Sequence, residues 1–263
     1  MSESTAFETV RYAVRDEIAH VTLDRPEARN ALSTALMRDL TAAFVRAGTD
    51  PGVRVVILTG AGKAFCAGVD LKEPATPASE TVAPGERPAV WRAMEACRRP
   101  IIGAINGAAI TGGFELALAC DVLVASTNAR FADTHARVGV IPGAGLSQRL
   151  SRAIGIYRAK YLSLTGNFLS AEQAYEWGLV SHVVPPEQLD DAAIVVARDM
   201  LSVLPPMLEP YKALIDEGFA QEFGAAMDLE SRRSAAHIEA MGAWAGARGA
   251  LEAVRERGRE RSS

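Results

Sequence analysis

The stretch PIIGAINGAAITGGFELALACDVLVA, residues 100–125, decides the fold because it holds one full unit of a repeating pattern. Asn106, Glu115, Asp121 and several glycines break up this otherwise apolar run. Such residues are costly inside a bilayer, which argues against a membrane-spanning helix. We interpret the stretch as a buried strand, a glycine loop (GAAITGG), a helix (FELALAC) and a second buried strand (DVLVAS).

A similar unit occurs upstream, where the β-branched run VRVVILTG is followed by the glycine-containing loop AGKAFCAGVD. The order of strand, glycine loop and helix at 53–72 and again at 101–119 is a weak internal repeat. Alternation alone favours a doubly wound sheet. From about residue 185 the pattern is helical, with helices expected near 186–204, 206–217 and 224–257. We also expect a long mobile loop over 74–88, where four prolines fall.

Two further segments give local predictions. Ser33 caps an expected helix in which Leu36, Leu40 and Phe44 recur every four residues, and Gly48 ends it. After Pro142 we expect helices almost throughout, including one that begins with a capping box formed by Ser170 and Gln173 and ends at Gly178.

Composition bounds the possible functions. The chain has 263 residues, 49% of them hydrophobic, which allows a sizeable core in one large domain or two small ones. A net charge of −4 argues against nucleic acid as a partner. Cys66, Cys97 and Cys120 form no CxxC pair, which is typical of reduced thiols in a cytoplasmic protein rather than of a metal site. The N-terminus lacks the pattern of a secretion signal.

The segment Gly112-Gly113-Phe114-Glu115 is the most unusual chemical feature. Dinucleotide-binding, P-loop, nucleophile-elbow and zinc-protease motifs are missing from the sequence. If a helix begins at Gly112, its first amides lack intrahelical partners, and Glu115 lies on the same face. A glutamate in a first helical turn commonly serves the helix dipole. Here the surroundings are apolar, so an unpaired acid would be costly and a functional role is favoured.

Three long blocks resemble the enoyl-CoA hydratase/isomerase (crotonase) family: KAFCAGVDLKE, NGAAITGGFELALACD and FADTHARVGVIPGAGLSQRL. The segments LDRPEARNAL and LTGNFLSAEQAYEWGLVSHVVP extend the resemblance over nearly the whole chain. It implies an α/β fold, a spiral of ββα repeats with a C-terminal all-helical trimerisation region. Residues 1–190 would form the spiral core with the acyl-CoA site, and residues 191–263 the helical region. A homotrimer or a dimer of trimers would follow, with no membrane partner.

The resemblance also implies an acyl-CoA thioester as substrate, with no separate cofactor and no metal. The backbone N–H groups of Val69 and Gly112 would hold the thioester oxygen, on which charge builds as the α-carbon gains enolate character. Further residues would line the path of the coenzyme or the acyl group: Ala28, Ala64, Gly68, Asp70, Leu71 and Gly143. Arg25, Lys63 or Lys72 could meet the CoA phosphates, or equally be solvated.

Hydratases of this family use two glutamates. One is retained as Glu115, but the position of the second, four residues before Gly139, holds His135. An imidazole titrates near neutral pH and can replace a carboxyl as acid or base. If ADTHAR is extended, Asp133, His135 and Arg137 share one face, and Asp133 could orient the ring while Arg137 opposes this.

Three functions stay open on the sequence. The favoured one is addition of water to a 2-enoyl-CoA to give a 3-hydroxyacyl-CoA, with Glu115 activating water and His135 delivering a proton to Cα. The second is a Δ3-Δ2 enoyl-CoA isomerase that uses Glu115 alone. The third is an acyl-CoA binding protein without turnover.

Overall fold

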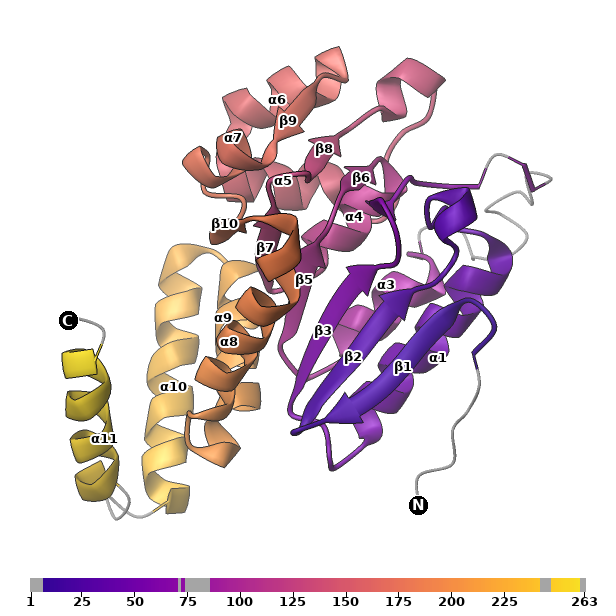
Figure 1. The fold of residues 1–263 in the computed structure, drawn as a ribbon. Coiled ribbons are helices and arrows are strands. Elements are labelled where there is room, and N and C mark those ends of the chain that lie inside the picture. Colours follow the sequence, from indigo (N-terminus) through magenta and orange to yellow (C-terminus); the bar gives the residue numbers. More distant parts are fainter. Residues whose placement is uncertain (1–6, 71, 74–85, 242–246, 261–263) are drawn as a thin grey trace. The chain divides into compact units, whose positions relative to one another are not determined.

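The computed structural model describes residues 7–70, 72–73, 86–241 and 247–260. The predicted loop over 74–88 falls mostly outside these residues. The chain forms two compact units, Met1–Leu208 and Glu209–Ser263 (Figure 1). Helix α8 (Leu189–Leu201), which spans the predicted division at residue 190, packs on the sheet of the first unit.

A six-stranded sheet forms the centre of the first unit. Its strand order is β1-β2-β3-β5-β7-β10, and every neighbouring pair is parallel except β1 and β2. The strands are β1 (Val10–Arg15), β2 (Ile18–Leu23), β3 (Val55–Gly60), β5 (Ile101–Ile105), β7 (Val122–Ser126) and β10 (His182–Val184).

A smaller four-stranded sheet has the order β4-β6-β8-β9, with β8 and β9 antiparallel. Its strands are β4 (Ala64–Cys66), β6 (Ala108–Ile110), β8 (Arg130–Ala132) and β9 (Phe168–Ser170). Successive repeats therefore give one strand to each sheet: β3 then β4, β5 then β6, β7 then β8. This is the predicted spiral of ββα repeats and not the doubly wound sheet that alternation alone favoured. The predicted loop GAAITGG is wrong in part, since β6 lies within it.

Both faces of the six-stranded sheet are covered by helices. Because side chains alternate along each strand, every strand contributes residues to both faces. Val56 and Leu58 of β3 belong to the core shared with helices α1 (Thr34–Thr49) and α3 (Ala89–Ala96). Val55 and Ile57 point to the other face and pack with α8. Strands buried on both faces explain why the sequence shows continuous apolar runs rather than alternation.

Helix α1 follows its sequence signals closely at its start. The Ser33 side chain accepts a hydrogen bond from the Leu36 amide at 3.1 Å, and Leu36, Leu40 and Phe44 are fully buried. Its end differs from the prediction, because the helix passes through Gly48 to Thr49. A glycine inside a helix costs about 1 kcal/mol relative to alanine, which tertiary packing offsets here.

The region after Pro142 contains helices α5 (Leu146–Ile154), α6 (Ile156–Thr165) and α7 (Ala171–Glu176). Ser170 and Gln173 form the predicted capping box at α7, and Gly178 has a φ of +80°. The prediction of helices almost throughout was wrong, since β9 and β10 lie in this region. Each has only three residues, too few for a periodic pattern.

The second unit is helical, with α9 (Leu208–Phe219) leading into it, followed by α10 (Phe223–Met241) and α11 (Ala247–Glu260). The single helix predicted over 224–257 is thus described as two. Among the described residues, no helix is long and apolar enough to cross a bilayer.

Candidate active site

Glu115 lies in the first turn of α4 (Gly112–Leu118), a helix whose seven residues are all buried. The glutamate is only 5% exposed, as expected from its apolar surroundings. Its Oε1 accepts a hydrogen bond of 2.8 Å from the Ala144 amide, and the Leu146 amide also interacts with the carboxyl group and lowers its pKa. These two amides belong to the IPGAG segment and the start of α5, which the chain folds back over α4.

Burial raises the pKa of Glu115 above its ordinary value, and the nearby charge of Asp133 adds to this. The Ala144 and Leu146 amides and His135 act in the opposite direction but do not cancel the effect of burial. A carboxyl with a raised pKa is a better proton acceptor once ionised than an exposed one. It is therefore suited to act as a general base near neutral pH.

His135 faces Glu115 across the site. Its Nε2 lies 3.8 Å from Oε2 of Glu115, and the residue is 7% exposed. The structure thus brings together the two residues that the family resemblance pairs. Two groups at this separation can both contact a single oxygen atom, such as that of a water molecule.

The segment ADTHAR does not meet the condition of being extended, because at His135 it enters a 3-10 helix, η2 (His135–Val138). Arg137 therefore leaves the face shared by Asp133 and His135, and its Nε donates a 2.7 Å hydrogen bond to the Thr165 carbonyl. Arg137 is therefore not placed to oppose Asp133 at the ring, as it could have been in an extended segment. Asp133 does contact the ring, with 2.7 Å between Oδ1 and Nδ1.

Of the two predicted oxyanion amides, that of Val69 lies in the loop after β4 and that of Gly112 at the start of α4. A Cβ built on Gly68 would lie 3.6 Å from the Gly112 nitrogen, and one on Gly112 would lie 3.8 Å from Cγ2 of Val69. Leu32 fixes the first loop, since its amide donates to the Gly68 carbonyl and its carbonyl accepts from the Asp70 amide. Within the described ranges, no hydrogen bond uses the N–H of Val69 or Gly112. Neither donor is thus engaged by another described residue.

Glycine is required at two positions here. Gly68 has a φ of +94°, and an added Cβ would meet the Ile110 carbonyl at 2.9 Å. At Gly113 a Cβ would lie 2.1 Å from the Cys66 carbonyl oxygen, a distance at which atoms overlap. The glycines therefore allow α4 to approach the loop after β4 closely enough to place the two amides side by side.

The remaining predicted residues come from separate segments of the chain. Ala28 ends the short 3-10 helix η1 (Pro26–Ala28), and Ala64 is buried in β4. Asp70 is buried, and hydrogen bonds from the Lys72 amide and Arg25 hold its pKa below the ordinary value. Gly143, next to Ala144, has open space where a Cβ would point. Leu71 lies outside the described residues.

The cations proposed for the CoA phosphates differ in their contacts. Arg25 bonds the Ala31 carbonyl at 2.7 Å and Asp70 at 3.0 Å, so its guanidinium is engaged within the protein. Lys63 and Lys72 have exposed side chains. In the part of the chain that the structure describes, no three His, Cys, Asp or Glu side chains come together as metal ligands.

Comparison with known proteins agrees with this geometry. The family model for enoyl-CoA hydratase/isomerase matches residues 14–245. A probable peroxisomal enoyl-CoA hydratase of Arabidopsis thaliana is 45% identical over 230 residues, covering 85% of this chain and 84% of that protein. The chain belongs to the enoyl-CoA hydratase/isomerase family. The predicted membership in this enzyme family is thereby confirmed.

Another relative in the family is the (E)-benzylidenesuccinyl-CoA hydratase of Thauera aromatica, 43% identical over 212 residues, which cover 77% of this chain and 80% of that protein. Among solved structures, an enoyl-CoA hydratase from Bacillus anthracis superposes with a TM-score of 0.84 at 36% identity, covering 95% of this chain and 97% of that one. This likeness confirms the predicted fold class.

Two residues that support the site, Thr111 and Asn30, could not be singled out from the sequence pattern. Thr111, just before Gly112, has a φ of +54°, which is uncommon for a β-branched residue, and its hydroxyl bonds that of Thr134. The pair ties the loop that presents the Gly112 amide to the segment that carries His135. Asn30 is fully buried and bonds the Arg25 amide and the Ala61 and Ala64 carbonyls. Of the two, only Asn30 could have been suspected from the sequence, because asparagine is common in turns and tolerates a positive φ.

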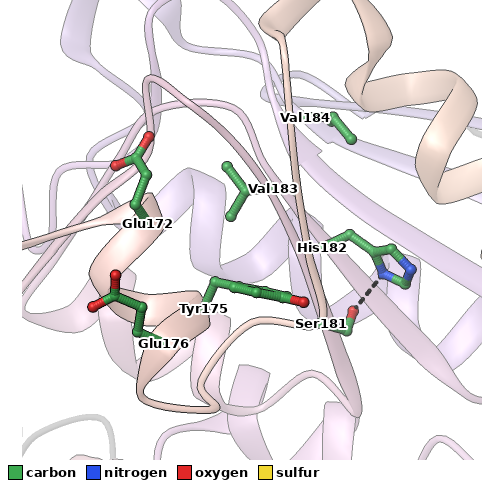
Figure 2. Close-up of a pocket in the computed structure, with 7 residues that line it drawn as sticks. All are labelled: Glu172, Tyr175, Glu176, Ser181, His182, Val183 and Val184. Atoms are coloured by element: carbon green, nitrogen blue, oxygen red, sulfur yellow. Dashed lines mark hydrogen bonds between the residues drawn. The ribbon is translucent and has the colours of Figure 1, made fainter.

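A pocket of about 530 Å³ lies elsewhere on the first unit, between α7 and β10 (Figure 2). Glu172, Tyr175 and Glu176 of α7 line one side of it, and Ser181 bonds His182 at 3.0 Å on the other. None of the residues predicted for the active site lines this pocket. The pocket is therefore separate from the Glu115–His135 pair.

The raised pKa of Glu115 predicts a pH-dependent difference in stability between the wild type and Glu115→Gln. The Glu115 carboxyl ionises at a lower pH in the unfolded chain than in the folded protein. Its contribution to the free energy of unfolding is therefore fully present below the unfolded pKa and is lost as pH rises through the folded pKa. Glutamine does not ionise and still accepts from Ala144. We expect Glu115→Gln to gain stability relative to the wild type as pH rises.

Urea unfolding of both proteins between about pH 4 and about pH 8 measures this difference. Asp133 has a lowered pKa and the opposite pH dependence, but it is present in both proteins and to first order cancels. A stability difference that stays constant over this range would contradict the burial of an ionisable Glu115.

Proposed function

We propose that the protein adds water to a 2-enoyl-CoA thioester and forms a 3-hydroxyacyl-CoA. The observation that carries this proposal is the buried pair of Glu115 and His135, whose Oε2 and Nε2 atoms are 3.8 Å apart. Glu115 lies one helical turn after Gly112 in α4, and the Gly112 amide lies beside the Val69 loop. The relatives reported above are named as hydratases. Double-bond migration and binding without turnover are therefore less favoured.

The thioester oxygen binds between the amides of Val69 and Gly112. Attack at Cβ moves electrons through the conjugated system and leaves negative charge on this oxygen. Two donors fixed by the backbone stabilise that charge more than they stabilise the neutral carbonyl, which lowers the barrier. Because both donors are backbone groups, the exposed side chain of Val69 takes no part in this step.

Glu115 and His135 divide the proton transfers. The ionised Glu115 takes one proton from water as the water oxygen bonds to Cβ. His135, as an imidazolium, gives a proton from Nε2 to Cα of the resulting enolate. The product gains one oxygen and two hydrogens, which is one water molecule. Glu115 is then protonated and His135 is neutral, and a proton passing between them restores the starting state.

The coenzyme is part of the substrate in this proposal, and no separate cofactor takes part. Its pantetheine and adenine would follow Ala28, Ala64, Gly68 and Asp70, and Gly143, which has open space where a Cβ would point, would leave room for the acyl group. Homotrimers or dimers of trimers are the proposed assembly. The cytoplasm is the proposed compartment, supported by three scattered cysteines that form no CxxC pair.

A panel of trans-2-enoyl-CoA thioesters with straight, branched and aromatic acyl groups tests the reaction class. We expect loss of the conjugated enoyl-thioester absorbance and formation of 3-hydroxyacyl-CoA, identified by mass spectrometry. A 3-enoyl-CoA in the same assay tests for isomerisation. Conversion of the 3-enoyl thioester without any hydrated product, or binding of every thioester without turnover, would refute the proposed hydration.

A further inference from the structure

Asp133 is a buried carboxylate, 2% exposed, that a hydratase using two glutamates does not need. Its Oδ1 lies 2.7 Å from Nδ1 of His135 and accepts a 3.2 Å hydrogen bond from the His135 amide. The Ser163 hydroxyl of α6 also interacts with this carboxyl group and helps to lower its pKa. Asp133 therefore touches His135 at two points and is itself held by a neighbouring helix.

These contacts fix which atom carries the proton. Burial alone would raise the pKa of Asp133, but its interactions with His135 and Ser163 outweigh burial and hold the pKa below the ordinary value. An ionised carboxylate only accepts hydrogen bonds. Nδ1, at 2.7 Å from it, must then be the donor, in both the neutral and the charged ring.

We propose that Asp133 is a positioning residue that holds His135 as the Nδ1–H tautomer and directs Nε2 toward Glu115. This inference rests on the proposed hydration and assigns Nε2 as the one ring nitrogen that exchanges protons. The Nε2 atom has both partners that the cycle requires: the substrate, which receives its proton, and Glu115 at 3.8 Å, which returns one.

The proton transfers return the site to its starting state, and Asp133 stays ionised throughout. The imidazolium loses its Nε2 proton to Cα and becomes the neutral Nδ1–H ring, with no rearrangement at the buried Asp133 side. Protonated Glu115 then supplies a proton to Nε2, directly or through one water. Without Asp133, the neutral ring could carry its proton on Nε2 instead, and that form cannot accept the proton from Glu115.

Kinetics of Asp133→Asn test the positioning role, with Asp39→Asn as a matched control. Asp39 is also buried and bonded by Thr9, but these contacts join α1 to the start of β1. We expect both variants to lose stability in urea unfolding. Only Asp133→Asn should lose kcat for 2-enoyl-CoA hydration, by about 100-fold with KM nearly unchanged. Equal and small effects on kcat in the two variants would overturn the proposal.

A spectroscopic measurement on the wild-type protein does not depend on how the variants fold. The chain has only four histidines, so ¹⁵N-histidine labelling resolves few ring signals, and His135 is assigned by its loss in His135→Gln. At a pH where the His135 signals show the neutral ring, the Nδ1–H tautomer is expected. The Nε2–H tautomer there would refute the positioning role even if hydration is observed. A wild type that hydrates no enoyl-CoA would instead refute the proposed function and the proton-transfer cycle. The His135 tautomer can be measured in that case too, because the measurement does not require activity.

Discussion

Replacing Glu115 by glutamine is expected to lower kcat for hydration of a 2-enoyl-CoA by about 10³-fold, within the range for loss of a general base. Glutamine keeps the size of the side chain and an oxygen that accepts from the Ala144 amide, so the site remains assembled. It cannot accept a proton from water. KM should change little, because the thioester is held by the backbone amides.

Stopped-flow or steady-state kinetics with crotonyl-CoA measure this effect. Glu17→Gln, in the turn between β1 and β2, is a control for the same chemical change at an exposed site. Glu115→Gln with more than about a tenth of wild-type kcat would be inconsistent with a role as the base. Full activity in His135→Ala would remove only the two-residue form of the mechanism.

Replacing Val69 by proline is expected to be the second large effect, a fall in kcat of about 100-fold, the typical cost of losing one oxyanion donor. Proline has no N–H. The hydrogen bonds that hold this loop to Leu32 use the Gly68 carbonyl and the Asp70 amide, so removing the Val69 N–H breaks neither of them.

Val69→Ala is the matched variant, because it keeps the N–H and removes most of a side chain that is 62% exposed. Near-wild-type kinetics are expected for it, and circular dichroism checks that both variants are folded. If the alanine variant were as impaired as the proline variant, the side chain and not the amide would be responsible, and the oxyanion assignment at residue 69 would fail.

Elements with a repeating pattern could be predicted from the sequence. The four-residue spacing of Leu36, Leu40 and Phe44 and the cap at Ser33 indicate α1, and all three apolar side chains are fully buried. The three-residue strands β6, β9 and β10 have no detectable period, so they could not be found in this way. They exist because a neighbouring strand pairs with them, which is information from distant parts of the chain.

The candidate site shows the same division. Glu115 could be singled out because an acid in an apolar first turn is costly unless it has partners. Its partners, the Ala144 and Leu146 amides, lie about thirty residues away along the chain and have no side-chain signal. The pairing of Glu115 with His135 came from family resemblance alone.

The contact between Asp133 and His135 was predicted on a wrong conformation. An extended segment would place the two side chains on one face, together with Arg137. The segment instead turns, and Asp133 reaches the His135 amide two residues on, a common use of aspartate in turns. The same turn keeps the ring beside Asp133 and sends Arg137 to the Thr165 carbonyl.

The most direct test of hydration with Glu115 as the base follows the oxygen atom of water. Crotonyl-CoA is incubated with the protein in H₂¹⁸O, and the product is analysed by mass spectrometry, with Glu115→Gln in parallel. We expect 3-hydroxybutyryl-CoA with ¹⁸O at C3, formed rapidly by the wild type and only slowly by the variant. Unlabelled product, a shifted double bond without ¹⁸O, or equal rates of labelling in the two proteins would contradict it.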